Sequence, residues 1–318
     1  DQYGAFAQAE IAFGDSGLFL TPGVRWDDFS LDPAADPTFP STAVALDGDR
    51  VSPKLAVRWT LASGFSVYGN WAEGFRPPTP GQVNNGFTNL FSPGFAYVSI
   101  GNPDLRPERS ETLELGVRGE AARLSWSLAY FDARYRDFIE QVVVGGTGTA
   151  RDPQRFQFVN LTRVEIDGFE ARAAWRASDA WSFELAYAQA EGRDTVDDVP
   201  LNSVQPPTVT AGIDWSPTDR VGTGLYARYV VEKSRDDVDS SGLGQGVLQF
   251  VPPSHTVVDL TARWRVLPKL EVGAGIYNLL DRKYWNWSDV QGQPQGSPVI
   301  DAYTQPGRSY AARLRYTF

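Results

Sequence analysis

The chain has 318 residues and a mass of 35.0 kDa, contains no cysteine and carries a formal net charge of −10. The absence of cysteine excludes disulfides, thiolate metal sites and cysteine nucleophiles, and the acidic balance argues against nucleic acid as a partner. The sequence has no run of about 18 apolar residues and so no helical membrane span, but a membrane barrel needs only about 10 alternating residues per strand.

Apolar and polar residues alternate along most of the chain, which is the period of β-strands. Short turns and long polar loops separate the alternating segments. We predict about 13 strands, near residues 3–13, 18–31, 51–61, 65–76, 110–119, 123–144, 156–176, 181–191, 208–216, 221–233, 255–266, 270–284 and 307–318. The short connections fall at one end of these strands and the long ones at the other, as in outer-membrane barrels, whereas a soluble sandwich scatters its long loops.

One face of the predicted strands is charged. In residues 169–176, for example, Glu170 and Arg172 alternate with Phe169 and Trp175. A charged face that recurs on strand after strand fits a wide polar interior with lipid outside. Tryptophans next to the short turns suit an aromatic girdle. We therefore predict an all-β fold, an antiparallel transmembrane β-barrel; the alternative is a soluble sandwich with these aromatics in its core.

A long irregular segment, residues 74–109, separates two of these strands. It opens with Gly-Phe-Arg-Pro-Pro (74–78) and closes with Asn-Pro-Asp-Leu-Arg-Pro-Glu (102–108). Its prolines remove donors from any regular ladder, and its aromatic residues favour an ordered loop over a disordered one. We predict an ordered functional loop.

The two ends of this loop resemble the FRAP-type and NPNL-type boxes of TonB-dependent outer-membrane haem and haemoglobin receptors. The residues that carry the resemblance are Phe75, Arg76, Pro77, Pro78, Asn102, Pro103, Asp104 and Leu105. Residues 135–140, 158–170 and 277–290 are also similar to that family. The resemblance implies active import of haem or another iron chelate across the bacterial outer membrane. It also implies lipid and the TonB energy-coupling protein as partners, haem or a haem-carrying protein outside the cell, and no permanently bound cofactor.

Members of this family carry an amino-terminal plug domain inside a barrel of 22 strands. Neither a plug-like stretch nor so many strands is found in this sequence. We therefore expect residues 1–318 to be the carboxy-terminal portion of the barrel of a longer receptor. The start at Asp1 and the absence of methionine fit a removed leader or a piece of a longer chain. Phe318, which shares a strand face with Tyr316 and Leu314, resembles the usual end of such barrels.

Receptors of the haem branch usually present an iron-binding histidine between the two boxes, but residues 79–101 contain none. Tyr97 is the candidate iron ligand, because a phenolate can hold haem iron, and Phe87, Phe91 and Phe95 could flank a porphyrin. The alternative is that these aromatics only hold the loop against the barrel rim. The box residues likewise have a structural alternative, a charged cluster that fixes where the loop leaves the wall, formed by Arg76, Asp104, Arg106 and Glu108.

Other functions stay open at this point. The substrate could be a siderophore or another nutrient, and a passive channel would share the same wall. The lone His255, beside Ser254, suggests a hydrolase only if a third group orients it. The acidic loop 236–242 has oxygen ligands but not the spacing of a calcium loop, so we predict a solvated loop there.

Overall fold

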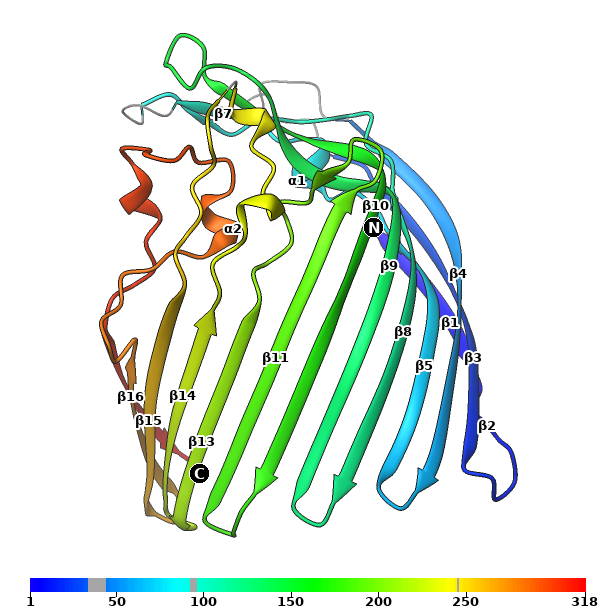
Figure 1. Cartoon of the computed structure of the whole chain (residues 1–318), viewed down its shortest axis with the longest axis vertical. Coiled ribbons are helices and arrows are strands. Elements are labelled where there is room, and N and C mark those ends of the chain that lie inside the picture. Colours follow the sequence, from blue (N-terminus) through cyan, green and yellow to red (C-terminus); the bar gives the residue numbers. More distant parts are fainter. Residues whose placement is uncertain (34–43, 92–95, 245) are drawn as a thin grey trace.

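The computed structural model describes residues 1–33, 44–91, 96–244 and 246–318. Within these residues the chain forms one sheet of 17 strands, curved into an open wall (Figure 1). The wall strands are β1 (Gln2–Gln8), β2 (Ile11–Ala12), β3 (Leu18–Leu31), β4 (Leu46–Ala62), β5 (Phe65–Arg76), β8 (Glu108–Ala121), β9 (Leu124–Gly145), β10 (Gln154–Arg176), β11 (Trp181–Asp194), β13 (Thr208–Thr218), β14 (Val221–Val230), β15 (His255–Leu267), β16 (Leu270–Tyr277) and β17 (Ser309–Tyr316). β1 and β2 both pair antiparallel with β3, and from β3 onward each wall strand pairs antiparallel with the next wall strand.

The wall confirms the antiparallel all-β prediction. β1 and β2 are two halves of the first predicted strand, so the long strands of the described residues correspond to the 13 predicted segments. Three short strands were not predicted and lie in the loops: β6 (Thr88–Asn89), β7 (Tyr97–Ile100) and β12 (Val199–Pro200). The predicted end of β16 near residue 284 was wrong, because Asn278 and Asp281 have positive φ angles of 50° and turn the chain away from the sheet.

Short turns join the strands at the lower end of the wall, and long loops join them at the upper end (Figure 1). The turn between β4 and β5 shows how tightly the lower end is built. Gly64 has φ +77°, and a Cβ there would lie 1.9 Å from the carbonyl oxygen of Glu120 in the neighbouring turn. Only glycine therefore fits this position.

The two faces of the wall differ in chemistry. Large apolar side chains form rows on one face and stay exposed: Leu115 at 53%, Leu128 at 50%, Phe169 at 56% and Leu185 at 54%. Since these rows belong to one sheet and face no second sheet among the described residues, the sandwich alternative is wrong. Burying each such side chain is worth about 1.5–3 kcal/mol, so the face is suited to a hydrocarbon surrounding.

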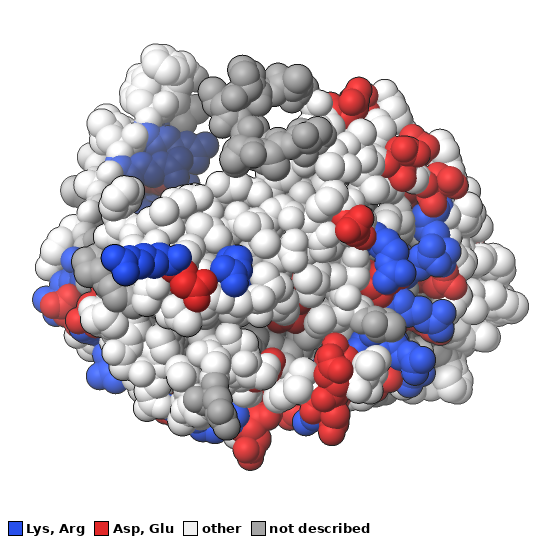
Figure 2. All heavy atoms as spheres, turned by 90° about the horizontal axis from the view of Figure 1, so that it is seen from above, with Lys and Arg blue, Asp and Glu red and all other residues white. Residues whose placement is uncertain are grey.

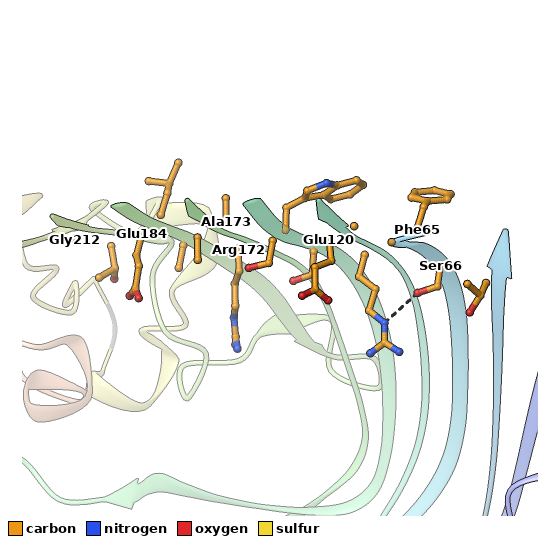
Figure 3. Close-up of a pocket in the computed structure, with 18 of the residues that line it drawn as sticks. Phe65, Ser66, Glu120, Arg172, Ala173, Glu184 and Gly212 are labelled. Carbon is orange, nitrogen blue, oxygen red and sulfur yellow. Dashed lines mark hydrogen bonds between the residues drawn. The ribbon is translucent and has the colours of Figure 1, made fainter. Parts of the chain in front are cut away.

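The opposite face is polar. Figure 3 shows Phe65 and Ala173 pointing to one side of the wall, while Arg172 and Glu184 point to the other. On that polar side Arg172 lies 3.0 Å from Glu170. Alternation therefore separates a lipid-compatible exterior from a charged concave interior, as predicted.

Apolar residues are buried together at the upper end of the wall. Val83 and Leu105 from the loop and Ile139 from β9 form one buried cluster, and Val251, Trp287 and Val290 form another in the loops. Helical segments are short and also belong to the loops: α1 (Pro80–Val83), α2 (Trp287–Val290), and the 3₁₀ turns η1 (Arg235–Asp237), η2 (Ser241–Leu243) and η3 (Ile300–Tyr303). In the part of the chain that the structure describes, no helix qualifies as a membrane span.

The sheet is open in the described residues. β1 pairs with β3, and β17 pairs with β16, but no pairing joins β1 to β17. All eight residues of β17 are exposed. The wall therefore has two free edges, which is what an incomplete barrel predicts.

Candidate substrate-binding end of the wall

The two sequence boxes meet at the upper end of β5 and β8. Arg76 and Glu108 are cross-strand partners, and the guanidinium of Arg76 donates two hydrogen bonds of 2.5 Å to the carboxylate of Glu108. Glu108 is 5% exposed and also accepts a hydrogen bond of 2.7 Å from the backbone N–H of Ile139. This bidentate, charge-assisted pair fixes the point at which the loop leaves the wall.

The second box is held by neighbouring strands. Asn102 Nδ2 donates to the carbonyl oxygen of Phe158 at 2.8 Å, and Arg106 is ion-paired with Asp137 at 2.5 Å. Asp104 is exposed, and its only hydrogen bond to another described residue runs from its backbone N–H to Asn102 Oδ1. Three members of the predicted charged cluster therefore anchor the loop, and Asp104 does not.

Packing completes the anchor. Leu105 is 2% exposed within the cluster of Val83 and Ile139. Pro78 is buried and Pro77 half-buried, while Pro103 is exposed. The ring of Phe75 lies 5.7 Å from that of Phe29. These contacts assign the box residues a structural role.

Tyr97 lies on β7, which pairs parallel with β10 through Gln154. Its ring is 5.7 Å from the ring of Phe87 and 5.9 Å from that of Phe156. The expectation that prolines keep this segment out of the ladder was therefore wrong for residues 97–100, which contain no proline. The loop is anchored to the wall through its own short strand.

The predicted aromatic set is brought together only in part. Phe87 is 56% exposed beside Tyr97, and Phe91 is 95% exposed. Phe95 lies outside the described residues. The structure therefore shows one aromatic pair, Phe87 and Tyr97, with an accessible ring.

A second group of contacts, not foreseen from the sequence, ties three loops to the upper end of β9. Glu140 accepts a hydrogen bond of 3.2 Å from the N–H of Ser203. Trp287 Nε1 donates to the carbonyl oxygen of Asn202 at 2.6 Å. Lys233 Nζ donates to Val204 O at 2.8 Å and lies 4.9 Å from the ring of Trp287. No short motif marks this group, because its members are far apart in the chain.

Burial changes the ionisation of two members of this group. Lys233 lies beyond the end of β14, and Glu140 lies in the upper part of β9, above the last pair of β10 with β11, so both are outside the membrane-spanning part of the wall. Burial raises the pKa of Glu140 to about 7, and burial lowers the pKa of Lys233 to about 8. In both cases the packed loops disfavour the charged form.

A cavity of 450 Å³ adjoins this group. Its lining includes the carboxyl groups of Glu140, Asp194, Asp197 and Asp239 and the amides of Gln249 and Gln291. Gln249 is 1% exposed, and its Nε2 has no hydrogen-bond partner among the described residues. Such a lining is suited to hydrogen-bonding, neutral or cationic ligand groups. Seen from above, charged side chains gather toward the sides of this end (Figure 2).

The acidic loop 236–242 is only partly solvated. Asp236 and Asp237 are exposed, as predicted. The backbone of Asp239, in contrast, exchanges hydrogen bonds of 2.8 and 3.0 Å with the side chain of Asn202. Among the described residues no group of three or more metal-ligating side chains is found.

His255 has the surroundings of a structural residue. It is 5% exposed, its Nδ1 lies 3.2 Å from the carbonyl oxygen of Pro253, and its ring lies 4.7 Å from that of Tyr284. Within the described residues no carboxylate is bonded to it. The described residues around His255 therefore do not form a catalytic triad.

Comparison with known proteins assigns the chain to a family. The family described as TonB dependent receptor-like, beta-barrel matches residues 1–279. The chain belongs to this family. The resemblance seen in the sequence is thus confirmed, as are the barrel fold and the outer-membrane location. The family and these relatives are receptors, not enzymes.

Its relatives bind different molecules. The chain is 26% identical over 276 residues to the hemoglobin-haptoglobin-binding protein A of Haemophilus influenzae, covering 78% of this chain and 26% of the relative. It is 26% identical over 328 residues to the ferric enterobactin receptor of Pseudomonas aeruginosa, covering 95% and 40%. The copper transporter OprC shares the fold, with a TM-score of 0.74, 21% identity, and coverage of 100% of this chain and 48% of that one. The chain spans less than half the length of these relatives.

Proposed function

We propose that this TonB-dependent receptor imports haem or another iron chelate across the outer membrane, with its upper loops capturing the substrate. The pair of Phe87 and Tyr97 at the anchored loop carries the proposal, because it places an exposed aromatic ring beside a phenol, a group that can hold haem iron. Relatives named for hemoglobin binding and a hemin receptor of Yersinia pestis, 27% identical over 259 residues, support haem as the substrate.

Active import needs an energy source and a domain that changes conformation to let the substrate pass. The concave face of the wall is polar and charged, which fits a lumen that holds a plug domain. We propose that the complete receptor contains such a plug, that residues 1–318 form the carboxy-terminal portion of its barrel, and that the TonB protein acts on the plug from the inner side. Lipid surrounds the apolar face, and no cofactor is permanently bound.

A siderophore or another metal chelate is the second candidate. The cavity lined by Glu140 and Asp239 carries carboxyl and amide side chains beside apolar ones, and the matches to an enterobactin receptor and a copper transporter fit such a substrate. A passive channel is the third; it would conduct ions without TonB.

The test compares two single variants in the complete protein, displayed on cells that depend on haem for iron. We expect Tyr97→Ala to be displayed normally but to reduce haem uptake at least about tenfold, since it removes the proposed ligand. Arg76→Ala, which removes the partner of Glu108, should instead reduce display and uptake together. Surface labelling measures display, and growth on haem measures uptake.

Normal haem uptake by a normally displayed Tyr97→Ala receptor would refute the ligand role. Uptake of a siderophore in place of haem by the unaltered receptor would favour the second candidate. Uptake that continues without TonB, with steady ion conductance in a planar bilayer, would favour the channel.

A further inference from the structure

Three arginines form a cross-strand row on the upper part of the wall. Arg136 of β9 is the direct partner of Arg109 on β8 and of Arg163 on β10. All three are exposed. Since neighbouring Cα atoms in antiparallel pairs are about 4.5–5.5 Å apart, this arginine row is about 10 Å long.

The arginine row points to the lipid side. Its members are an even number of residues from Leu115, Leu128 and Phe169, the exposed apolar residues of the same three strands, and the pairing register does not shift between them. Residues an even number apart share one face of a strand. Arg172, by contrast, is an odd number of residues from Arg163 and points to the concave side in Figure 3.

The arginine row lies above the apolar band, and at least one row of charged side chains separates the two. The outward apolar residues end at Leu113 on β8, Tyr130 on β9 and Phe169 on β10, four to six residues below the row. With a rise of about 3.4 Å per residue and a tilt of about 45°, the arginines lie about 10–15 Å above the edge of the band. This is the level of lipid headgroups on the side of the long loops, which is the outer leaflet in such barrels.

Charges in the neighbouring outward row are all engaged within the chain. Arg134 lies 3.3 Å from Asp132 and 4.0 Å from Glu165. Glu111 accepts a hydrogen bond of 2.9 Å from Trp71 Nε1. The guanidinium groups of the arginine row, in contrast, make no ion pair or hydrogen bond with any residue that the structure describes.

Three like charges directly opposite one another repel, so this arrangement is unfavourable unless an anion binds it. We propose that the arginine row binds the phosphorylated headgroup of a glycolipid in the outer leaflet, held alongside β8, β9 and β10. Guanidinium groups match phosphate oxygens in bidentate geometry, and basic clusters beside a bilayer recruit anionic headgroups. The apolar band, whose edge lies about 10–15 Å below the arginine row, accommodates the acyl chains of the same lipid.

The test uses the complete receptor purified from outer membranes in mild detergent. Native mass spectrometry measures binding of a bis-phosphorylated glycolipid and of the same glycolipid after removal of its phosphates. We expect the triple variant R109Q/R136Q/R163Q to retain at least about tenfold less of the phosphorylated lipid than the unaltered protein. The dephosphorylated lipid should bind both proteins equally weakly.

The matched control is R118Q/R172Q/R263Q, which removes the same charge from the concave face and should bind lipid like the unaltered protein. Heat-modifiable electrophoretic mobility verifies that each barrel is folded; if the triple variant does not fold, the three single variants replace it, each with a partial loss. Equal retention by the outward variants and the unaltered protein would overturn the proposal. Equal losses in both triple variants, or displacement of the lipid by inorganic phosphate, would overturn it as well.

Discussion

Glu140 and Lys233 are ionisable side chains held among packed loops, and their pKa values give the upper end of the receptor a pH dependence. The pKa of Glu140 is raised in the folded protein to about 7, so its contribution to stability is complete below about pH 4.5 and is lost as the pH rises through 7. The pKa of Lys233 is lowered to about 8, so its contribution is present above about pH 10.5 and is lost as the pH falls through 8. Between pH 5 and 7, the change of stability with pH therefore comes mainly from Glu140.

Glu140→Gln should make the protease sensitivity of the loops less dependent on pH. Because the charged carboxylate is disfavoured in the cluster, we expect loop 231–254 to be cleaved by protease about tenfold faster in the unaltered protein than in the variant at pH 8, and at similar rates at pH 5. The ratio of the two rates cancels the pH dependence of the protease. Glu232→Gln is the control, since Glu232 is exposed; a ratio that does not change with pH would contradict the prediction.

Individual residues were predictable where a short motif brought them together. The two boxes pointed to Arg76 and Glu108, and the structure pairs them. Glu140 had no such signal, because its partner Ser203 lies 63 residues away. The side chain of Asp104 is part of the same motif as Arg106 but stays in solvent, which the pattern alone could not distinguish.

On the scale of single strands, the alternation of side chains decides which substitutions the wall tolerates. Leu185 and Glu184 are neighbours on β11, yet Leu185 is 54% exposed on the apolar face and Glu184 points to the concave side (Figure 3). Adjacent positions on the strand therefore face opposite environments, hydrocarbon for one side chain and water for the next.

Leu185→Lys should destabilise the barrel by about 2–4 kcal/mol, because a lysine near the middle of a lipid-facing strand is desolvated. Glu184→Lys introduces the same side chain one position earlier and should cost less than about 1 kcal/mol. Urea-induced unfolding of the complete receptor in lipid vesicles measures both. Equal losses from the two substitutions would show that the apolar face is not in contact with lipid.

Strands were well predicted because period-two alternation is a local signal. The pairing of β7 with β10 was not predictable in this way, since it joins Tyr97 to Gln154 and depends on how the loop folds back. The end of β14 at Val230 instead of residue 233 has a similar cause, because Lys233 packs against Trp287 from a distant loop.

For the molecule as a whole, the outstanding feature is the pair of free edges at β1 and β17. In lipid each unpaired backbone group costs several kcal/mol. The sequence already indicated an incomplete cylinder, because 13 strands fall short of the 22 expected from the family resemblance. What alternation could not provide was the curvature and the loop packing above the wall.

Residues 1–318 produced alone and refolded in detergent micelles should therefore self-associate through these edges. We expect dimers or larger species by light scattering, with antiparallel β content by circular dichroism. The complete receptor under the same conditions is the control and should be monomeric. A monodisperse, folded monomer of residues 1–318 would contradict the assignment of β1 and β17 as open edges.

The parallel pairing of β7 with β10 imposes an order on the formation of strand pairs during folding. β7 precedes β8 and β9 in the chain, yet its partner strand, β10, follows both of them. The segment between the two boxes can therefore complete its pairing only once β10 has joined the wall beside β9. The shape of the loop that carries Tyr97 thus depends on wall strands that follow it in the chain.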